Sequence, residues 1–84
     1  MSRFFAEPRK IHVFTDKNGQ PAGVVWRGRR QAVRVCNHWR IEGEWWENNG
    51  VAREYYKVIG TASLILVLYY DRLGNAWYVE RVVD

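Results

Sequence analysis

The sequence predicts an all-β domain, a small antiparallel sheet of about six strands rolled into an SH3-like or OB-like barrel. Stretches rich in β-branched and aromatic residues recur about every ten residues and are separated by turn residues. No stretch keeps an apolar pattern of helical period for more than about ten residues, so no long helix is expected. A chain of 84 residues suits one domain, residues 1–84, with a thin core.

Turn signals separate the expected strands. Asn18-Gly19 supplies the positive φ angles of a tight hairpin turn, and a second reversal is expected around Gly28-Arg29. Segment 38–42 either continues the strand before it through a bulge or forms a strand of its own. After a short lead-in over residues 1–9, strands are expected at 10–15, 23–27, 30–37, 38–42, 53–60, 63–70 and 76–83.

Alternation within these strands predicts which side chains face the core. Trp39 and Ile41 are expected to point inward and their neighbours outward, and Tyr55 is expected in the core. Segment 63–70 is apolar on both faces, which indicates a central strand covered on both sides or a strand whose outer face meets another chain. Alternation also places Ile11 and Val13 on one face of their strand, and Val33 and Val35 on one face of theirs, opposite Ala32, Arg34 and Cys36.

Charge is distributed unevenly along the chain. The net charge is +4, yet residues 1–40 hold nine Lys and Arg against two acids, whereas residues 41–84 hold four against seven. Such asymmetry suggests a polyanionic partner for the basic half. It is also consistent with two halves that neutralise each other across one small sheet, because opposite charges commonly pair across strands.

Few residues suit catalysis or metal binding. Cys36 is the single cysteine, so it has no disulfide partner within the chain, and it is expected to be a small, half-buried core residue. His12 and His38 are expected to be ordinary strand residues, because with Cys36 they are too few and too dispersed for a zinc site. The sequence therefore predicts no metal, no cofactor and no enzyme activity. A reducing, cytoplasmic setting is expected, without a secretion signal or membrane span.

The order of motifs resembles a known family. The most specific motifs are Glu42-Gly43-Glu44-Trp45-Trp46 and the closing Trp77-Tyr78-x-x-Arg81-Val82-x-Asp84, within a resemblance over about residues 8–84. They resemble a small bacterial domain of unknown function that occurs alone or at the C-terminus of ImuB-type Y-family polymerase-like proteins. The resemblance implies a setting in damage-induced translesion DNA synthesis, but no activity. The chain departs from that family at Leu64–Leu68, an unbroken apolar run where a polar residue is expected.

The first candidate site is a basic hairpin that combines an indole with guanidinium groups. Arginine matches phosphate oxygens with a planar fork of donors and stacks on bases. Arg27 and Arg30 flank the expected turn, so both are expected to project from one face. The alternative is a solvated hairpin tip whose charges protect a sheet edge from aggregation. The candidate nucleic-acid-binding residues are Trp26, Arg27, Arg29, Arg30, Arg34 and Arg40.

The second candidate site is an aromatic and acidic surface for a protein partner. Trp45 and Trp46 are adjacent, so in an extended segment they point to opposite faces and one is expected to be exposed. The nearby carboxylates are expected to bind Arg40 and Arg53 or a partner's arginine. The candidate partner-binding residues are Trp45, Trp46, Glu42, Glu44 and Tyr56.

Three functions are consistent with these features. The first is a non-enzymatic accessory module, associated with DNA repair or translesion synthesis through a polymerase-like protein partner. The second is direct binding of single-stranded or primer-template DNA by the basic hairpin and neighbouring rings. The third is a structural homodimer formed through the strand Leu64–Tyr70. Small barrels commonly recognise peptides or nucleic acids, so fold class alone does not separate these functions.

Overall fold

The computed structural model describes residues 2–42 and 52–83, and of residues 2–7 and 42 only the backbone. These residues form β-strands and no helix, which confirms the all-β prediction for the described part of the chain. The strands are β1 (Ser2–Lys10), β2 (His12–Thr15), β3 (Pro21–Trp26), β4 (Arg29–Ala32), β5 (Arg34–Glu42), β6 (Ala52–Ile59), β7 (Ile65–Asp71) and β8 (Ala76–Val83).

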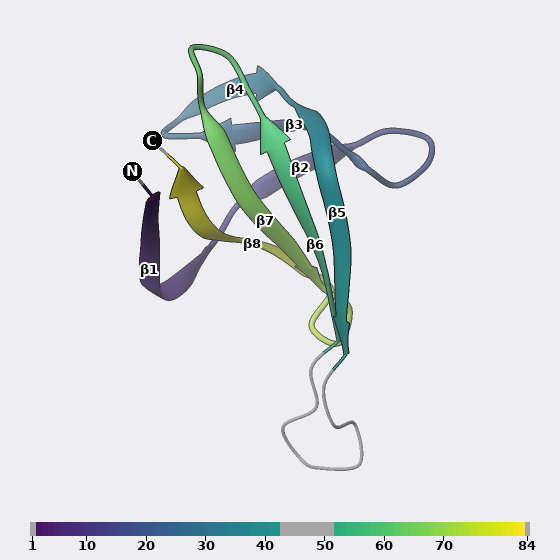
Figure 1. Cartoon of the computed structure of the whole chain (residues 1–84). Helices are drawn as coiled ribbons and strands as arrows, with labels where there is room; N and C mark the ends of the chain where they lie inside the picture. The colour runs from purple at the N-terminus through teal and green to yellow at the C-terminus, as the bar shows by residue number, and fades with distance from the viewer. Residues whose placement is uncertain (1, 43–51, 84) are drawn as a thin grey trace.

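The eight strands form two antiparallel sheets (Figure 1). The large sheet has five strands in the order β1-β8-β7-β6-β5, and the small sheet has three in the order β2-β3-β4. Figure 1 shows the strands of the small sheet running across one face of the large sheet. The prediction of an antiparallel all-β fold is therefore confirmed. Among the described residues, strand pairing forms two separate sheets and does not close into a barrel.

The chain passes from one sheet to the other at two residues. β1 leads into β2 at Ile11, whose N–H donates to the carbonyl oxygen of Trp77 at 3.1 Å. β4 leads into β5 at Val33, whose N–H donates to the carbonyl oxygen of Ala22 at 3.0 Å. Two strands that the sequence predicts as continuous are therefore divided between the sheets. The structure has eight strands instead of about six for two reasons. The predicted strands are divided at these residues, and β1 occupies the segment predicted to be a lead-in.

The main core lies between the two sheets. Val24 of the small sheet is completely buried against residues from three strands of the large sheet, β6, β7 and β8. Ile11 and Val13, which share one face of their predicted strand, and Val33 and Val35, which share one face of theirs, all pack against this core. Its buried members from the large sheet are Tyr56, Val58, Leu66, Leu68, Val79 and Val82.

The opposite face of the large sheet carries a row of aromatic rings. Strand register places Trp39 opposite Tyr55, Tyr55 opposite Tyr69, and Tyr69 opposite Tyr78. The ring centroids are 5.4, 5.2 and 5.2 Å apart in that order. Tyr55 and Tyr69 are only 4% and 3% exposed, so Tyr55 is buried as predicted. The guanidinium carbon of Arg53 lies 4.5 Å from the centroid of Tyr69 and adds a cation–π contact.

β7 is the central strand of the large sheet, as its two apolar faces predict. Leu66 and Leu68 face the main core, whereas Val67 and Tyr69 belong to the cluster on the opposite face. The backbone of β7 is paired on both sides, with β6 and with β8. A homodimer through this strand would therefore have to use a face of the sheet and not an edge.

Two side-chain predictions for β5 are wrong, those for Ile41 and Cys36. Ile41 is 44% exposed, because it shares with Trp39 the face of β5 that points away from the main core. His38 is exposed as predicted, and its ring stacks on the buried ring of Tyr56 with a centroid separation of 4.4 Å. Cys36, expected half-buried, is exposed at a register irregularity between β5 and β6. Such an irregularity changes which face each following side chain occupies.

Candidate functional site

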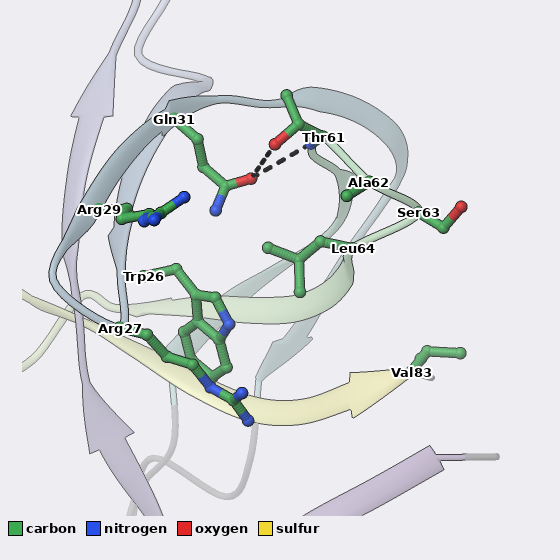
Figure 2. Close-up of a pocket in the computed structure, with 9 residues that line it drawn as sticks. All are labelled: Trp26, Arg27, Arg29, Gln31, Thr61, Ala62, Ser63, Leu64 and Val83. Carbon is green, nitrogen blue, oxygen red and sulfur yellow. Dashed lines mark hydrogen bonds between the residues drawn. The ribbon is translucent and has the colours of Figure 1, made fainter.

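A pocket of about 640 Å³ lies between the β3–β4 hairpin and the turn that joins β6 to β7 (Figure 2). The hairpin contributes an indole, two guanidinium groups and an amide, and the turn contributes two hydroxyl groups. No acidic residue is among the described residues that line it. The lining residues are Trp26, Arg27, Arg29, Gln31, Thr61, Ala62, Ser63, Leu64 and Val83.

The hairpin turn on one side of the pocket is centred on Arg27 and Gly28. Their φ angles are 51° and 77°, both in the left-handed region. Two consecutive positive φ angles match a two-residue turn that follows the right-handed twist of the paired strands. Trp26 and Arg29 are directly opposite each other across this hairpin. The turn therefore lies one residue earlier than the reversal predicted at Gly28-Arg29.

This one-residue difference decides which arginines reach the pocket. Side chains alternate along β4, so Arg29 and Gln31 share the pocket face with Trp26, whereas Arg30 points to the opposite face of the small sheet. The guanidinium carbon of Arg30 lies 4.0 Å from the ring centroid of Phe14 on that face. The expectation that Arg27 and Arg30 project from one face is therefore wrong.

The turn on the other side of the pocket spans Thr61–Leu64. Leu64 N–H donates to the carbonyl oxygen of Thr61 at 3.1 Å. Ala62 and Ser63 have φ angles of 54° and 63°. A residue with a Cβ atom in this region costs about 1–2 kcal/mol, so the turn is strained.

Gln31 holds this strained turn against the small sheet. Its Oε1 accepts hydrogen bonds from Thr61 N–H at 3.2 Å and from Thr61 Oγ1 at 3.0 Å, both drawn in Figure 2. Gly60 makes room for the amide, because a Cβ atom there would lie 2.7 Å from Gln31 Oε1. These hydrogen bonds thus connect the β3–β4 hairpin to the β6–β7 turn, the two sides of the pocket.

The hairpin side of the pocket is rich in hydrogen-bond donors. Figure 2 shows the guanidinium of Arg29 and the amide nitrogen of Gln31 pointing inward beside the indole of Trp26. Trp26 is half-buried and packs against the main core, which fixes its ring. The guanidinium carbon of Arg27 lies 5.7 Å from the Trp26 ring centroid. A positively charged pocket with donors and one aromatic ring suits a ligand that carries phosphate and planar groups.

Comparison with known proteins assigns the chain to a family. The family described as Domain of unknown function (DUF6504) matches residues 1–84, the whole sequence. The chain belongs to DUF6504. No curated protein and no solved structure matches it significantly. A function for this DUF6504 domain must therefore be argued from its residues.

The remaining predicted nucleic-acid residues of the DUF6504 domain lie apart from the pocket. Arg34 is exposed at the start of β5, where its register partner is Ile59. Arg40 binds Glu54 near the other end of β5, with Nε 3.0 Å from Oε1. The structure therefore brings together three of the six predicted residues, Trp26, Arg27 and Arg29, and separates the other three.

Most of the predicted partner-binding residues lie outside the described part of the chain. This applies to Trp45, Trp46, Glu44 and the side chain of Glu42. Tyr56 is described, and its ring is 4% exposed between the main core and His38.

Glu54 is the centre of a polar group on the core-facing side of β6. It accepts hydrogen bonds from Arg40 on Oε1 and from the hydroxyl of Tyr56, 3.3 Å away, on Oε2. The hydrogen bond from Arg40 holds the pKa of Glu54 below its ordinary value, so this carboxylate is ionised near neutral pH. Burial raises the pKa of Tyr56, which therefore stays protonated.

Sequence reasoning missed the residues that complete the pocket. Gln31 lies inside a basic strand, and nothing in its neighbours indicates that its amide binds a turn 30 residues later. Ala62 and Ser63 have no turn signature of the Asn-Gly type, so their positive φ angles are not readable from sequence. Gly60 was the one signal that could have been used, since an isolated glycine at the end of a strand often marks a close backbone approach.

The described residues contain neither a group of metal ligands nor a membrane-spanning helix. Over residues 2–42 and 52–83, no three His, Cys, Asp or Glu side chains group closely enough to hold a metal ion. In the same part of the chain, no helix is long and apolar enough to cross a membrane.

Proposed function

We propose that this DUF6504 domain is a non-enzymatic recognition module that binds single-stranded DNA through the pocket of Trp26, Arg27 and Arg29. The observation that carries the proposal is the convergence of one indole and two guanidinium groups in a pocket without an acidic lining residue among those described. Proteins that bind single strands combine a basic groove, which follows the phosphates, with rings on which bases stack.

Backbone strain around the same pocket supports a functional role. Four described residues with Cβ atoms have positive φ angles, and three of them, Arg27, Ala62 and Ser63, line the pocket. Strained conformations of this kind cluster at binding sites, because the surrounding structure must hold them. A hairpin tip whose only role was solubility would not require an arginine in the left-handed region, where Asn or Gly is less costly.

The family resemblance supplies the cellular setting of the proposal. It supports a cytoplasmic role in DNA repair or translesion synthesis, next to a polymerase-like protein of the ImuB type. The crossing of the two sheets, joined at Ile11 and Val33, supports an SH3-like or OB-like barrel as the architecture. Binding without catalysis is the activity that we propose.

A fluorescence titration at two salt concentrations tests this function. We expect a single-stranded oligonucleotide to change tryptophan fluorescence saturably at about 50 mM salt and much more weakly at about 200 mM, because phosphate contacts release counterions. Arg29→Glu should weaken binding and lower the salt slope by about 0.7 for each phosphate that the domain no longer neutralises. An unchanged signal at both salt concentrations would discard the proposal.

Arg30→Glu is the matched control, because it makes the same charge change on the neighbouring residue. Arg30 lies on the opposite face of the hairpin, over Phe14. Both variants change long-range electrostatics equally, so only a direct contact separates them. Equal loss of affinity in the two variants would indicate a general charge effect and contradict a role for the pocket.

Assembly with a polymerase-like protein is the second proposed function. Ile41 favours it, because this large side chain is 44% exposed immediately before the acidic and aromatic segment 42–47. A purified ImuB-type protein should bind the wild-type domain, and Trp45→Ala with Trp46→Ala should reduce that binding at least about tenfold if an indole is an anchor. Unchanged affinity would exclude these indoles. Sedimentation at several protein concentrations tests the homodimer directly.

A further inference from the structure

A second pocket, of about 430 Å³, lies on the core-facing side of the large sheet, and the turn between β2 and β3 forms part of its wall. Strand register places Glu54 opposite Tyr70, and Tyr70 opposite Trp77, in one row across β6, β7 and β8. Thr15, Asn18 and Gly19 line the pocket from the small-sheet hairpin, and Tyr56 completes the lining. None of these residues lines the pocket of Trp26.

Three aromatic rings are tilted against one another in this pocket. Trp77 lies between the other two, with centroids 5.1 Å from Tyr70 and 5.5 Å from Tyr56. The interplanar angles are 50° and 45°, so the rings form walls of different orientation instead of one stack. Aromatic walls in this arrangement attract a cation through the negative potential of the ring faces.

Glu54 is the one carboxylate among the described residues that line the pocket, and its charge is paired with that of Arg40. Glu54 binds the Arg40 guanidinium through Oε1, whereas Oε2 receives one long hydrogen bond, 3.3 Å, from Tyr56. A carboxylate offers about four lone-pair positions, so Oε2 has capacity for a further donor. The contact with Arg40 also demonstrates that a guanidinium can approach Glu54 along the sheet surface.

We propose that this pocket binds an arginine side chain of a partner protein, which would lie against Tyr70 and Trp77 and donate to Glu54 Oε2. A planar, weakly hydrated guanidinium stacks on aromatic faces and pairs with carboxylates better than an ammonium group does. The site is chemically opposite to the pocket of Trp26, for which we propose an anionic ligand. One domain would thus present an anion site and a cation site on different strands.

Titration with two small probes tests this assignment on the intact domain. The probes are N-acetyl-arginine amide and N-acetyl-citrulline amide, which have nearly the same shape but differ in charge. We expect the arginine probe to shift the NMR signal of the Trp77 indole N–H saturably, and the citrulline probe to bind at least about tenfold more weakly, as expected for loss of a charge-assisted hydrogen bond. Equal shifts from both probes would overturn the proposal without any variant.

Glu54→Gln supplies the second test, with Asp71→Asn as its matched control. Both changes neutralise one carboxylate in adjacent strands of the large sheet, but Asp71 does not line the pocket. Glu54→Gln should weaken the arginine probe at least about tenfold, and Asp71→Asn should leave it unchanged. Wild-type affinity in Glu54→Gln, in a domain whose NMR spectrum stays dispersed, would contradict the site. Arg29→Glu should not affect this probe, so the test is independent of DNA binding.

Discussion

Glu54 couples charge, hydrogen bonding and packing at a single residue. Its carboxylate joins Arg40 from β5 to the hydroxyl of Tyr56, and Tyr56 is a member of the main core. The side chain of Arg40 is 53% exposed, so water screens the pair and its contribution to stability is modest. Glu54 therefore acts as much by orienting the side chains of Arg40 and Tyr56 as by stabilising the fold.

The stability of the domain should depend on pH through Glu54. Arg40 lowers the pKa of Glu54 below its ordinary 4.5, so the ionised form stabilises the folded state. This contribution is complete above the unfolded pKa and is lost as pH falls through the lower, folded pKa. Urea unfolding between about pH 7 and pH 3 should show a loss below about 1 kcal/mol from this pair.

Arg40→Gln should flatten that pH dependence, because it removes the largest cause of the lowered pKa. Arg34→Gln is the control, since Arg34 lies on the same strand with Ile59 as its register partner. The same acid sensitivity in Arg40→Gln and wild type would show that other carboxylates dominate.

Residue chemistry in the basic hairpin is readable from sequence, but the side that each residue occupies is not. The sequence indicates correctly that Trp26, Arg27 and Arg29 are neighbours, yet it also groups them with Arg30, which lies on the other face. A turn one residue earlier exchanges the faces of a strand, and Arg27-Gly28 and Gly28-Arg29 are similar as turn signals. Sequence alone therefore cannot decide between them.

At the scale of elements, two turns with positive φ angles face each other across the pocket of Trp26. The β3–β4 turn uses Arg27 and Gly28, and the β6–β7 turn uses Ala62 and Ser63. The third hairpin, with Asn18-Gly19, carries the expected turn residues: Asp16 Oδ1 accepts from Asn18 N–H at 2.8 Å, and Gly19 has φ of 80°. Strain is thus confined to turns that border the pocket and to one further turn residue, Asn75, among the described positive φ angles.

Arg27→Asn should stabilise the domain and weaken DNA binding. Asn tolerates the left-handed region and Asn-Gly is favoured in this turn type, so we expect a gain of about 0.5–1 kcal/mol in the free energy of unfolding. The same change removes a guanidinium from the pocket. Urea unfolding and the oligonucleotide titration measure the two effects, and a stabilised variant with wild-type affinity would exclude Arg27 from the interface.

Strand positions are more predictable than strand ends. Tyr55 of β6 is buried as expected, and the doubly apolar run identifies β7 as central, whereas the burial of Tyr56 is not predicted. The divisions at Ile11 and Val33 are not visible, because a strand that bends between sheets keeps its alternating pattern on both sides of the bend. Long-range interactions, such as that of Gln31 with Thr61, likewise leave no local signal in the sequence.

For the whole molecule, one main core joins both sheets. Leu68 and Val24 are both completely buried in it, although they belong to different sheets. Separating the sheets would expose the apolar side chains of both to water, so the two should unfold as one cooperative unit.

Leu68→Ala should destabilise both sheets together, by about 2–5 kcal/mol, because it removes buried apolar surface and leaves a cavity. Amide hydrogen exchange should show the most protected amides of β3 and β7 losing protection by the same factor. Leu73→Ala is the control, since Leu73 is 67% exposed and its truncation should cost less than about 0.5 kcal/mol. Loss of protection in the large sheet alone would show that the small sheet is an independent unit.

Force applied to the chain would meet a geometry with little mechanical resistance. β1 and β8 are antiparallel neighbours, and Ser2 is paired with Val83, so the two ends leave the sheet side by side (Figure 1). A pull between them loads the ladder from its open end, and its hydrogen bonds break one after another instead of shearing together. β1 would peel away first, while the core between Val24 and Leu68 remained closed. Under tension the domain would therefore extend first by detachment of the edge strand β1, and both pockets would keep their structure during that step.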